Sequence, residues 1–350
     1  MNASFDVVIV GGGVTGAAVG YGLAKRGVKT CLVDAVPTFS RASRANMGLI
    51  WCQSKALGCP QFVRWGFASS RAYGKLAAEL KELSGIDTGY APTGGIIPCL
   101  GEAELEARAK FIEKLRAETE DGTYPASVLS RKELEGMLPK VPFGPEVSGG
   151  IWSDMDGYVD PLHLMFAFRK SFVRLGGTLF AGERVSEVKP SGKGYTVVCG
   201  GRTLECGKAV LAAGLGVRKL AAQLGTDIPV FPNKSQVMLL ERIPADVLPI
   251  PLLGIARTFG GTVMIGAAHE NMGMDRRLTP EVLAANAQWA VRVWPELERK
   301  RILRFWTGLR VWPKDAYPIY DRIPGHENAF VFAMHSAVSL AAILEQALPD

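Results

Sequence analysis

The residues best suited to chemistry lie within the first 34 positions of the chain. Gly11, Gly13 and Gly16 form a G-x-G-x-x-G pattern after the apolar run Phe5–Val10, and Asp34 lies 34 − 16 = 18 positions beyond the last of these glycines. Glycines at this spacing permit a tight turn and a close approach of the backbone to a pyrophosphate, and a carboxylate at this distance accepts hydrogen bonds from a ribose. The pattern therefore predicts a dinucleotide-binding site.

The segments around these glycines fit the same interpretation. A helical pattern runs from residue 17 to residue 25, and a second apolar strand ends at Asp34. The backbone N–H groups that open such a helix, at Val14 and Thr15, face bound phosphates. Asp34 and the adjoining Ala35 are then expected beside the ribose, and the charge of Asp34 argues against a 2′-phosphorylated cofactor. These residues alone leave the choice between NAD and FAD open.

The composition is that of a globular protein with a sizeable core. The chain has 350 residues, 48% of them hydrophobic, and a net charge of +6 that is spread along the sequence. Because no basic stripe alternates with aromatic residues, we expect no nucleic-acid partner. Because no signal peptide and no bilayer-length apolar stretch can be recognised, we expect no transmembrane segment and a cytoplasmic location.

Cysteine and histidine show no metal-binding spacing. The six cysteines are scattered without a C-x-x-C pair, and the four histidines form no cluster with each other or with cysteine. We therefore predict reduced thiols and no metal site.

Strand and helix patterns alternate along the chain and predict an α/β fold. This pattern changes near residue 87 and returns after about sixty residues. We expect a discontinuous, Rossmann-like nucleotide-binding domain that is interrupted by an α+β substrate domain with a mixed sheet. The expected ranges are 1–86, 145–225 and 325–350 for the first domain, and 87–144 and 226–324 for the second.

Two helix starts can be recognised within these ranges. Ser130 is followed three residues later by Glu133, which is the pattern of a capping box. Asp160 precedes Pro161, and aspartate suits the N-cap as proline suits the first turn.

Three later segments resemble parts of the D-amino-acid-oxidase-type flavoproteins. Arg41–Gly48 is similar to that family's serine- and asparagine-containing loop after the second strand, and Ala209–Gly214 to its second nucleotide-contacting strand and turn. The most specific match is Trp306–Arg310 followed by Asp315–Ile319, which resembles the family's W-x-G-x-R…D-x-x-P-I segment. The family includes glycine oxidase, sarcosine oxidase, D-amino-acid dehydrogenases, and the FAD subunits of hydrogen cyanide synthase and of opine and hydroxyproline dehydrogenases.

The resemblance implies a set of contacts to FAD. Met334–Ala341 is similar to the family's last strand-to-helix turn, which faces the N1 and O2 edge of the flavin, although Met334 and Ala337 stand where glycine is usual. Ser43 would hydrogen-bond to a phosphate, and the absence of cysteine from 311–313 implies non-covalent FAD. The implied FAD contacts outside the first 35 residues are Ser43, Arg44, Asn46, Met47, Gly48, Val185, Ala213, Gly214, His335, Ser336, Ala337, Val338 and Ser339.

The resemblance also implies the reaction. Arg310 would bind a substrate carboxylate, because its planar guanidinium forms a bidentate, charge-assisted pair. The Cα–H bond of a neutral amine would point at flavin N5, hydride transfer would give an imine, and water would hydrolyse the imine to an oxo acid. The implied substrates are a D-amino acid, glycine or sarcosine, D-proline or hydroxyproline, or an opine.

Two alternatives stay open at this point. A NAD-dependent dehydrogenase would explain residues 11–34 but not the segment around Arg310. The other alternative is an FAD-holding subunit of a heteromeric dehydrogenase that passes electrons to partner subunits, since the chain has no cysteine cluster for an iron–sulfur centre of its own. Oxidase and dehydrogenase are not distinguished, and Trp51, Trp312 and Tyr317 are interpreted as core or pocket residues.

Overall fold

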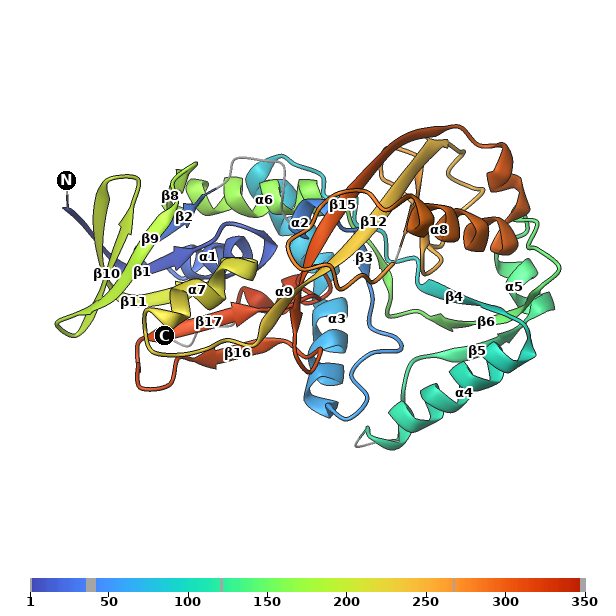
Figure 1. Ribbon diagram of the computed structural model, residues 1–350, viewed down its shortest axis with the longest axis horizontal. Coiled ribbons are helices and arrows are strands. Elements are labelled where there is room, and N and C mark those ends of the chain that lie inside the picture. Colours follow the sequence, from blue (N-terminus) through green and yellow to red (C-terminus); the bar gives the residue numbers. More distant parts are fainter. Residues whose placement is uncertain (1, 36–41, 120–121, 267, 347–350) are drawn as a thin grey trace.

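The computed structural model of the chain has two lobes (Figure 1). It describes residues 2–35, 42–119, 122–266 and 268–346. One lobe contains an eight-stranded sheet, and the other contains a four-stranded and a three-stranded sheet. The long helix α3 (Pro60–Ser84) lies between them. The observed α/β architecture, with parallel and antiparallel sheets, confirms the predicted fold class.

The eight-stranded sheet has a parallel centre. Its strands are β1 (Asn2–Val10), β2 (Thr30–Asp34), β8 (Thr178–Ala181), β9 (Val185–Ser191), β10 (Gly194–Cys199), β11 (Arg202–Leu211), β16 (Ile319–Arg322) and β17 (Ala329–Ala333). Their order is β16-β17-β11-β1-β2-β8, and β10 pairs with both β11 and β9. All neighbours from β17 to β8 are parallel, whereas β16 is antiparallel to β17. Such a sheet is covered on both faces, which explains the unbroken apolar run in β1.

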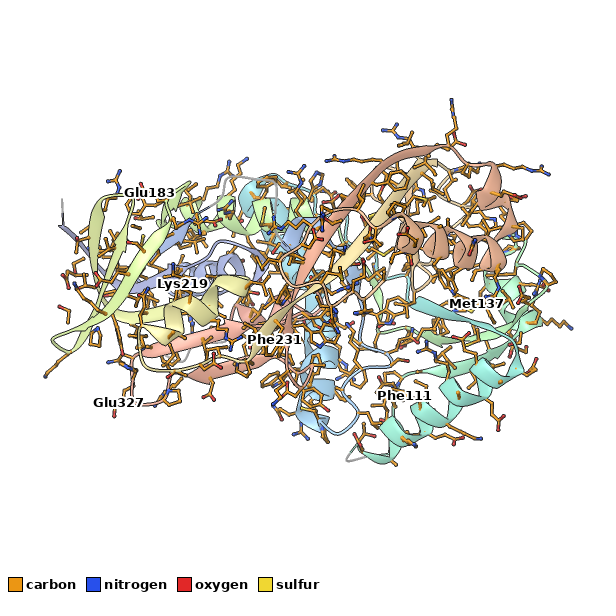
Figure 2. All side chains as sticks on the ribbon, viewed as in Figure 1. Phe111, Met137, Glu183, Lys219, Phe231 and Glu327 are labelled. Carbon is orange, nitrogen blue, oxygen red and sulfur yellow. The ribbon has the colours of Figure 1, made fainter. Side chains whose placement is uncertain are left out.

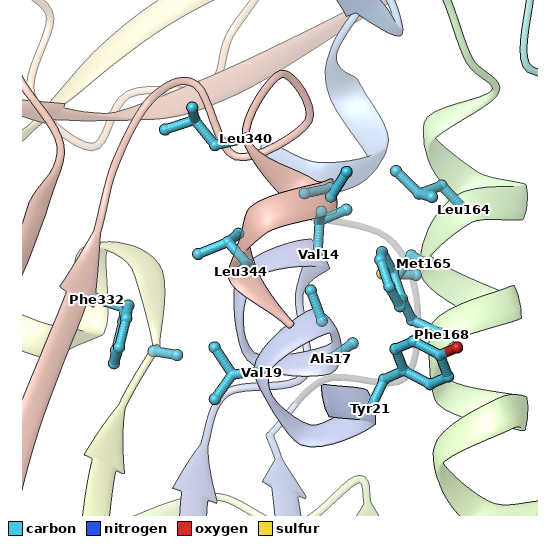
Figure 3. Close-up of a cluster of buried hydrophobic side chains, with 14 of the residues drawn as sticks. Val14, Ala17, Val19, Tyr21, Leu164, Met165, Phe168, Phe332, Leu340 and Leu344 are labelled. Carbon is cyan, nitrogen blue, oxygen red and sulfur yellow. The ribbon is translucent and has the colours of Figure 1, made fainter. Parts of the chain in front are cut away.

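Three helices cover one face of this sheet (Figure 3). They are α1 (Val14–Lys25), α6 (Pro161–Arg174) and α9 (Ala341–Leu344). Figure 3 shows Tyr21 of α1 directed toward Phe168 of α6, and their rings lie 5.7 Å apart. Leu344 of α9 lies on the other side of α1. The start of α1 is thereby fixed between two neighbours, and this fixes the glycine-rich turn that precedes it.

The second lobe combines two antiparallel sheets. The four-stranded sheet has the order β13-β14-β12-β15 and the three-stranded sheet the order β4-β6-β5. The backbone of Ile96 joins them, because its N–H donates to the Pro251 carbonyl at 3.0 Å and its carbonyl accepts from Leu253 N–H at 2.8 Å. The strands are β4 (Gly95–Leu100), β5 (Ser127–Ser130), β6 (Val147–Ser153), β12 (Val230–Arg242), β13 (Ile255–Arg257), β14 (Thr262–Gly266) and β15 (Ile302–Pro313).

The remaining elements lie around these sheets. The helices are α2 (Ala42–Ala45), α4 (Glu102–Ala117), α5 (Arg131–Met137), α7 (Val217–Ala222) and α8 (Pro280–Val293), with 3₁₀ turns η1 (Gly214–Gly216) and η2 (Pro295–Arg299). A two-stranded ribbon pairs β3 (Leu49–Ile50) with β7 (Gly157–Tyr158). Figure 2 shows Glu183 and Glu327 at the end of the first lobe, and Phe111 and Met137 on the second. No described helix has the length and apolarity needed to cross a membrane.

Both predicted helix starts are confirmed. The Ser130 side chain accepts from the Glu133 N–H while the Glu133 carboxylate accepts from the Ser130 N–H. The Asp160 side chain accepts from Leu162 and His163 at the start of α6.

The predicted domain division does not coincide with strand pairing at two places. Residues 145–153 were assigned to the nucleotide-binding domain, yet β6 pairs with β4 and β5 of the second lobe. Residues 319–324 were assigned to the substrate domain, yet β16 pairs with β17 of the large sheet. Both strands lie within a few residues of the expected boundaries at 145 and 325, and the composition of a strand does not reveal the sheet that it joins.

Candidate active site

The turn between β1 and α1 has no room for side chains. Gly11 has a φ of +109°, and a Cβ atom on it would lie 2.4 Å from the carbonyl oxygen of Ala212. A Cβ atom on Gly16 would lie 1.9 Å from the carbonyl oxygen of Gly11. Both positions require glycine, so the turn presents bare backbone at the N-terminus of α1, where anions bind.

Ser43 lies against the same turn, although it is distant in sequence. Its Oγ accepts a hydrogen bond from the backbone N–H of Val14 at 3.0 Å. The same oxygen would lie 2.9 Å from a Cβ atom on Gly13. Thr15 is the next residue of the first helical turn. The structure therefore brings the predicted phosphate-binding turn and the predicted serine-containing loop together.

Asp34 is paired with a cation that the sequence did not indicate. Arg169 of α6 donates from Nη2 to Oδ2 of Asp34, and both side chains are buried. Gly12 lies over this pair, because a Cβ atom there would be 2.8 Å from both of these atoms. Asp34 ends β2 and Ala35 follows it at the same sheet edge as the glycine-rich turn. Arg169 thus fixes the carboxylate at the position predicted for ribose recognition.

The loop after α2 is shaped by Asn46. Its Oδ1 accepts from the Gly48 N–H at 2.8 Å, and its Nδ2 donates to the carbonyl oxygens of Ala42 and Ser43 at 3.1 and 2.9 Å. Gly48 has a φ of +75°, and a Cβ atom there would lie 2.1 Å from the Val159 carbonyl oxygen. The side chain of Asn46 is therefore engaged within its own loop. Arg44 lies in α2, whereas Arg41 of the predicted motif lies outside the described residues.

The W-x-G-x-R segment lies on β15 and contacts this loop directly. The indole Nε1 of Trp306 donates to the carbonyl oxygen of Ala45 at 3.1 Å. A Cβ atom on Gly308 would lie 2.5 Å from the Cβ of Ala45, and Met47 and Trp306 pack against the same small hydrophobic cluster around Tyr158. Because alternate residues of a strand share a face, Arg310 is presented on the same face as Trp306 and Gly308.

The guanidinium of Arg310 is held by neutral groups. Nη1 donates to Asn233 Oδ1 at 3.0 Å and to the Ala268 carbonyl oxygen at 2.7 Å, and Nη2 donates to Ser235 Oγ at 2.8 Å. Asn233 and Ser235 lie on β12, which pairs with β15 so that Asn233 stands opposite Arg310. Burial lowers the pKa of Arg310 to about 10, so the side chain stays a cation at neutral pH.

Two histidines and a tryptophan extend this site from β15 to the C-terminal turn. His269 Nδ1 lies 2.9 Å from Asn233 Oδ1, which already accepts from Arg310, so Nδ1 of His269 is the donor. The Trp312 ring lies 5.3 Å from that of His269 and 4.8 Å from that of His335. Burial and then Arg310 lower the pKa of His269 to about 4. Burial, Lys55, Arg310 and His269 lower the pKa of His335, so both imidazoles are neutral at pH 7.

The turn after β17 is tied to the segment that follows α2. Ser339 Oγ accepts from the Trp51 N–H at 3.0 Å, and Tyr73 donates to the Val338 carbonyl oxygen at 2.6 Å. Ser336 Oγ lies 3.2 Å from His335 Nδ1. Ala337 packs against the core that covers one face of the large sheet. The predicted segment 335–339 therefore closes one side of the site, while the described part of the last helix, α9, is only four residues long.

Ala213 and Gly214 lie where β11 ends beside the glycine-rich turn. The Ala212 N–H before them donates to the Val10 carbonyl oxygen at 2.8 Å. Gly214 has a φ of +59°, and a Cβ atom there would lie 3.3 Å from Val311 Cγ2. Val185 at the start of β9 packs against the same hydrophobic core as Ala213, on the second face of the large sheet. Ala213 and Gly214 therefore lie at the edge of the glycine-rich turn, whereas Val185 pairs with Cys199 of β10, which stands opposite the start of β11.

Lys55 is a site residue that the sequence analysis missed. Its Nζ lies 3.4 Å from Ser336 Oγ, and it lowers the pKa of His335. Burial lowers the pKa of Lys55 itself, and Arg310 contributes in the same direction. The flanking residues Ser54 and Ala56 have φ values of +56° and +68°. Positive φ at residues other than glycine is uncommon and concentrates at functional sites, a signal that composition does not carry.

A buried carboxyl group positions the segment that carries Lys55. Asp156 Oδ1 accepts from the backbone N–H groups of Cys52 and Gln53 at 2.5 and 3.2 Å, and its Oδ2 accepts from Gln53 Nε2 at 2.7 Å. Burial raises the pKa of Asp156 to about 7. At the other end of the segment, Tyr317 donates to the Leu57 carbonyl oxygen at 2.5 Å. Both ends of 52–57 are thereby held.

A comparison with known protein families shows which family contains this chain. A model described as FAD dependent oxidoreductase (DAO) matches residues 6–344. The chain belongs to this family. Family membership establishes an FAD-dependent oxidoreductase and confirms the predicted cofactor, and it removes the NAD-dependent alternative.

Individual relatives align with nearly the whole length of this DAO-family chain. An opine oxidase subunit of Agrobacterium tumefaciens (strain Ach5) is 35% identical over 338 residues, which are 96% of this chain and 90% of the relative. The HcnC subunit of hydrogen cyanide synthase from Pseudomonas aeruginosa is 28% identical, covering 94% of this chain and 88% of the relative. The crystal structure of glycine oxidase from Geobacillus kaustophilus superposes with a TM-score of 0.90 and 26% identity, covering 98% and 93% of the two chains.

The residues present fit FAD. Cβ atoms at Gly11, Gly13 and Gly16 would fill the glycine-rich turn. Because glycine has no Cβ atom, a pyrophosphate can approach the backbone there. Asp34 lies at the end of β2, where its carboxylate would accept hydrogen bonds from a ribose. Within the described ranges, no three His, Cys, Asp or Glu side chains gather in a way that could hold a metal ion.

Proposed function

We propose that this DAO-family chain oxidises the C–N bond of an amino acid or related secondary amine that carries a carboxylate. The observation that carries this proposal is the environment of Arg310. Three neutral acceptors hold its guanidinium, and no acidic side chain is among its polar partners in the described part of the chain. A half-buried cation without a carboxylate partner is ready to bind an anionic ligand.

The side chains around Arg310 orient such a ligand. Asn233 and Ser235 fix the guanidinium on β12, and His269 fixes Asn233 through its donated hydrogen bond. Because the pKa of His269 is lowered to about 4, this residue adds no competing cation at neutral pH. A carboxylate bound to Arg310 would lie on the face of β15 that also contacts the loop 42–48.

The chain's own residues would also hold the cofactor. We assign the phosphates to the backbone of Gly11–Gly16 with Ser43, the ribose to Asp34 and Ala35, and the flavin edge to 46–48 and 335–339. When bound, FAD would supply the oxidant that takes the Cα hydride as the C–N bond becomes an imine, which water then hydrolyses to an oxo acid and an amine. Arg310 would contribute by positioning, which is worth a large share of such barriers.

The names of the relatives support a carboxylate-bearing amine. One relative is an opine oxidase subunit and one solved neighbour is a glycine oxidase. The test is an anaerobic screen of amino acids, N-alkyl amino acids and opines for bleaching of the flavin absorbance in the purified chain. Bleaching by at least one carboxylate-bearing amine supports the proposal. A chain that carries FAD and is bleached by none of these compounds, alone or with its natural partners, contradicts it.

A second candidate is a role within a heteromeric enzyme. Two of the relatives are named as subunits, which favours a chain that passes electrons to partner subunits. The measurement is reoxidation after anaerobic reduction. Rapid reoxidation by dissolved oxygen supports a self-contained oxidase, whereas slow reoxidation by oxygen and rapid reoxidation by an artificial acceptor support electron transfer to partners. Substrate-dependent bleaching of the isolated chain excludes a purely FAD-holding role.

A further inference from the structure

We propose that Lys234 and Glu270 are positioning residues for Arg310. Their buried ion pair fixes the segment 268–270 from the side of β12 that faces away from the guanidinium, and that segment supplies contacts to the guanidinium on the other side. The inference rests on the proposed function, because it concerns the affinity for the carboxylate that Arg310 would bind. It gives this pair a role in substrate binding without contact to the substrate.

The backbones of Lys234 and Glu270 form an isolated antiparallel bridge. The Lys234 N–H donates to the Glu270 carbonyl oxygen at 2.9 Å, and the Glu270 N–H donates to the Lys234 carbonyl oxygen at 3.0 Å. Successive residues of paired, extended backbone point to opposite faces. Residues 233 and 269 are therefore expected on one face of the bridge, and residues 234 and 270 on the other.

The contacts on the first face all lead to Arg310. Asn233 Oδ1 accepts from Arg310 Nη1 at 3.0 Å and from His269 Nδ1 at 2.9 Å, while Asn233 Nδ2 donates to Asn271 Oδ1 at 3.1 Å. The carbonyl oxygen of Ala268 accepts from Arg310 at 2.7 Å. The bridged segment therefore supplies one acceptor for the guanidinium and orients a second.

The opposite face carries the ion pair. Lys234 is 1% exposed, and its Nζ lies 3.1 Å from Glu270 Oε2. The same nitrogen donates to Thr279 Oγ1 at 2.8 Å and to the Arg277 carbonyl oxygen at 3.1 Å. Because an ammonium group has three donors, these three partners satisfy Lys234 completely.

The carboxylate of Glu270 is also fully engaged. Its Oε1 accepts from Gln236 Nε2 at 2.7 Å, and its Oε2 accepts from Thr279 Oγ1 at 2.9 Å. Burial alone would raise the pKa of Glu270, but the hydrogen bonds from its partners lower it overall, so the group is ionised at neutral pH. Thr279 directly precedes α8, so the network ties the segment 268–270 to β12 and to the start of this helix.

Loss of the Glu270 carboxylate would therefore be felt at Arg310. The Lys234 ammonium would lose its charge partner in a buried position, which is costly. The segment 268–270 would keep only backbone bonds on that face, and the Ala268 carbonyl would no longer be held in place. A bidentate pair between a guanidinium and a carboxylate depends on orientation, so we expect weaker substrate binding.

The first test measures the binding of an unreactive carboxylate. (Methylthio)acetate is the thioether analogue of sarcosine, and its binding to the FAD-loaded, oxidised protein is measured by calorimetry. Glu270→Ala should weaken this binding by about 10-fold or more, the effect of losing one hydrogen bond to a charged group. Glu270→Gln keeps an oxygen for Lys234 and Thr279 but loses the charge, and its affinity should fall between those of Glu270→Ala and wild type.

The second test asks whether Glu270 acts through Arg310. Glu270→Ala is introduced into wild type and into Arg310→Met, and the second-order rate constant for anaerobic flavin reduction is measured with the best amine of the screen. This constant should fall about 10-fold in the first background and less than about twofold in the second, because a residue that acts through Arg310 has no effect without it. Equal effects in both backgrounds would overturn the inference.

A control separates this role from general stabilisation of the second lobe. Glu146 accepts from Arg292 of α8 at 2.8 and 2.6 Å, so Glu146→Ala removes an ion pair of the same lobe and should leave the affinity for (methylthio)acetate unchanged. FAD content and urea unfolding are measured for each variant. Should Glu270→Ala fail to fold, Glu270→Gln takes its place in both tests.

The outcomes also distinguish this inference from the proposed function. Wild-type affinity for (methylthio)acetate in a folded Glu270 variant overturns only the role of the ion pair. No binding of (methylthio)acetate to wild type, or equal affinities of wild type and Arg310→Met, contradicts the proposed carboxylate site itself and the inference with it.

Discussion

The indole N–H of Trp306 donates to the carbonyl oxygen of Ala45 at 3.1 Å, across the junction between the two lobes. Ala45 ends the short helix α2, which also holds Ser43 against the glycine-rich turn, and Trp306 belongs to the strand that presents Arg310. One hydrogen bond thus joins the strand that would bind substrate to the loop that would bind FAD. We expect this junction to set how far Arg310 would lie from bound FAD.

Replacing Gly308 with valine should disturb this junction. A Cβ atom there would already lie 2.5 Å from the Cβ of Ala45, so β15 must shift away from the loop. Overpacking of this kind costs about 1–3 kcal/mol, and we expect a lower free energy of unfolding and weaker substrate binding. Denaturant unfolding and anaerobic flavin reduction measure the two effects. A variant with wild-type values in both would show that the contact is not restrictive.

Replacing Gly16 with alanine should abolish FAD binding. The new Cβ atom would lie 1.9 Å from the Gly11 carbonyl oxygen, and the phosphate-binding turn cannot keep its shape. The expected product is a colourless protein, measured as FAD per chain after purification. Gly136→Ala is the matched control, because a Cβ atom on Gly136 of α5 meets nothing within 4 Å. Full FAD content in Gly16→Ala would contradict this role of the turn.

Replacing Ser43 with alanine should weaken FAD binding without preventing it. The substitution removes the acceptor for the Val14 N–H at the start of α1. An unsatisfied buried donor and a lost hydroxyl cost about 1–3 kcal/mol, which corresponds to roughly 5- to 100-fold in the dissociation constant of FAD. Fluorescence titration of the apoprotein measures it, and Ser43→Thr should recover part of the affinity. Equal FAD affinities of Ser43→Ala and wild type would be the opposing result.

Asp156 should make stability depend on pH. Its pKa is raised to about 7 by burial, above the ordinary value near 3.9. Between about pH 4 and pH 7 the folded state then binds more protons than the unfolded state, so the free energy of unfolding falls as pH rises. The limiting slope is about 1.4 kcal/mol per pH unit. Urea unfolding from pH 4.5 to 7.5 should show this slope in wild type relative to Asp156→Asn, and identical profiles would exclude it.

The sequence was sufficient to predict those parts of the structure that depend on residues close together in the chain. The glycine spacing predicted the turn, because sterics at Gly11 and Gly16 leave no alternative residue. The capping box at Ser130 and the N-cap at Asp160 were also predictable, because each depends on residues within three positions.

Partners that are distant in sequence could not be predicted in the same way. Arg169 pairs with Asp34 from 135 positions away, and nothing in the helical pattern of α6 marks that residue. Lys55 escaped notice because its position depends on Asp156, which lies more than a hundred residues beyond the segment it holds. The pairing of β6 with β4 was missed because the residues of two strands from different parts of the chain do not indicate that the strands pair, or in which register.

The central claim is that Arg310 binds the carboxylate of an amine beside FAD. It is tested most directly by anaerobic titration of wild type and Arg310→Met, both loaded with FAD, with the best amine found in the screen. We predict equal FAD content and a roughly 30-fold or greater loss of amine affinity in the variant, since loss of one partner of a buried charge pair costs about 2–5 kcal/mol. An Arg310→Met protein that is bleached at wild-type amine concentrations would contradict the claim.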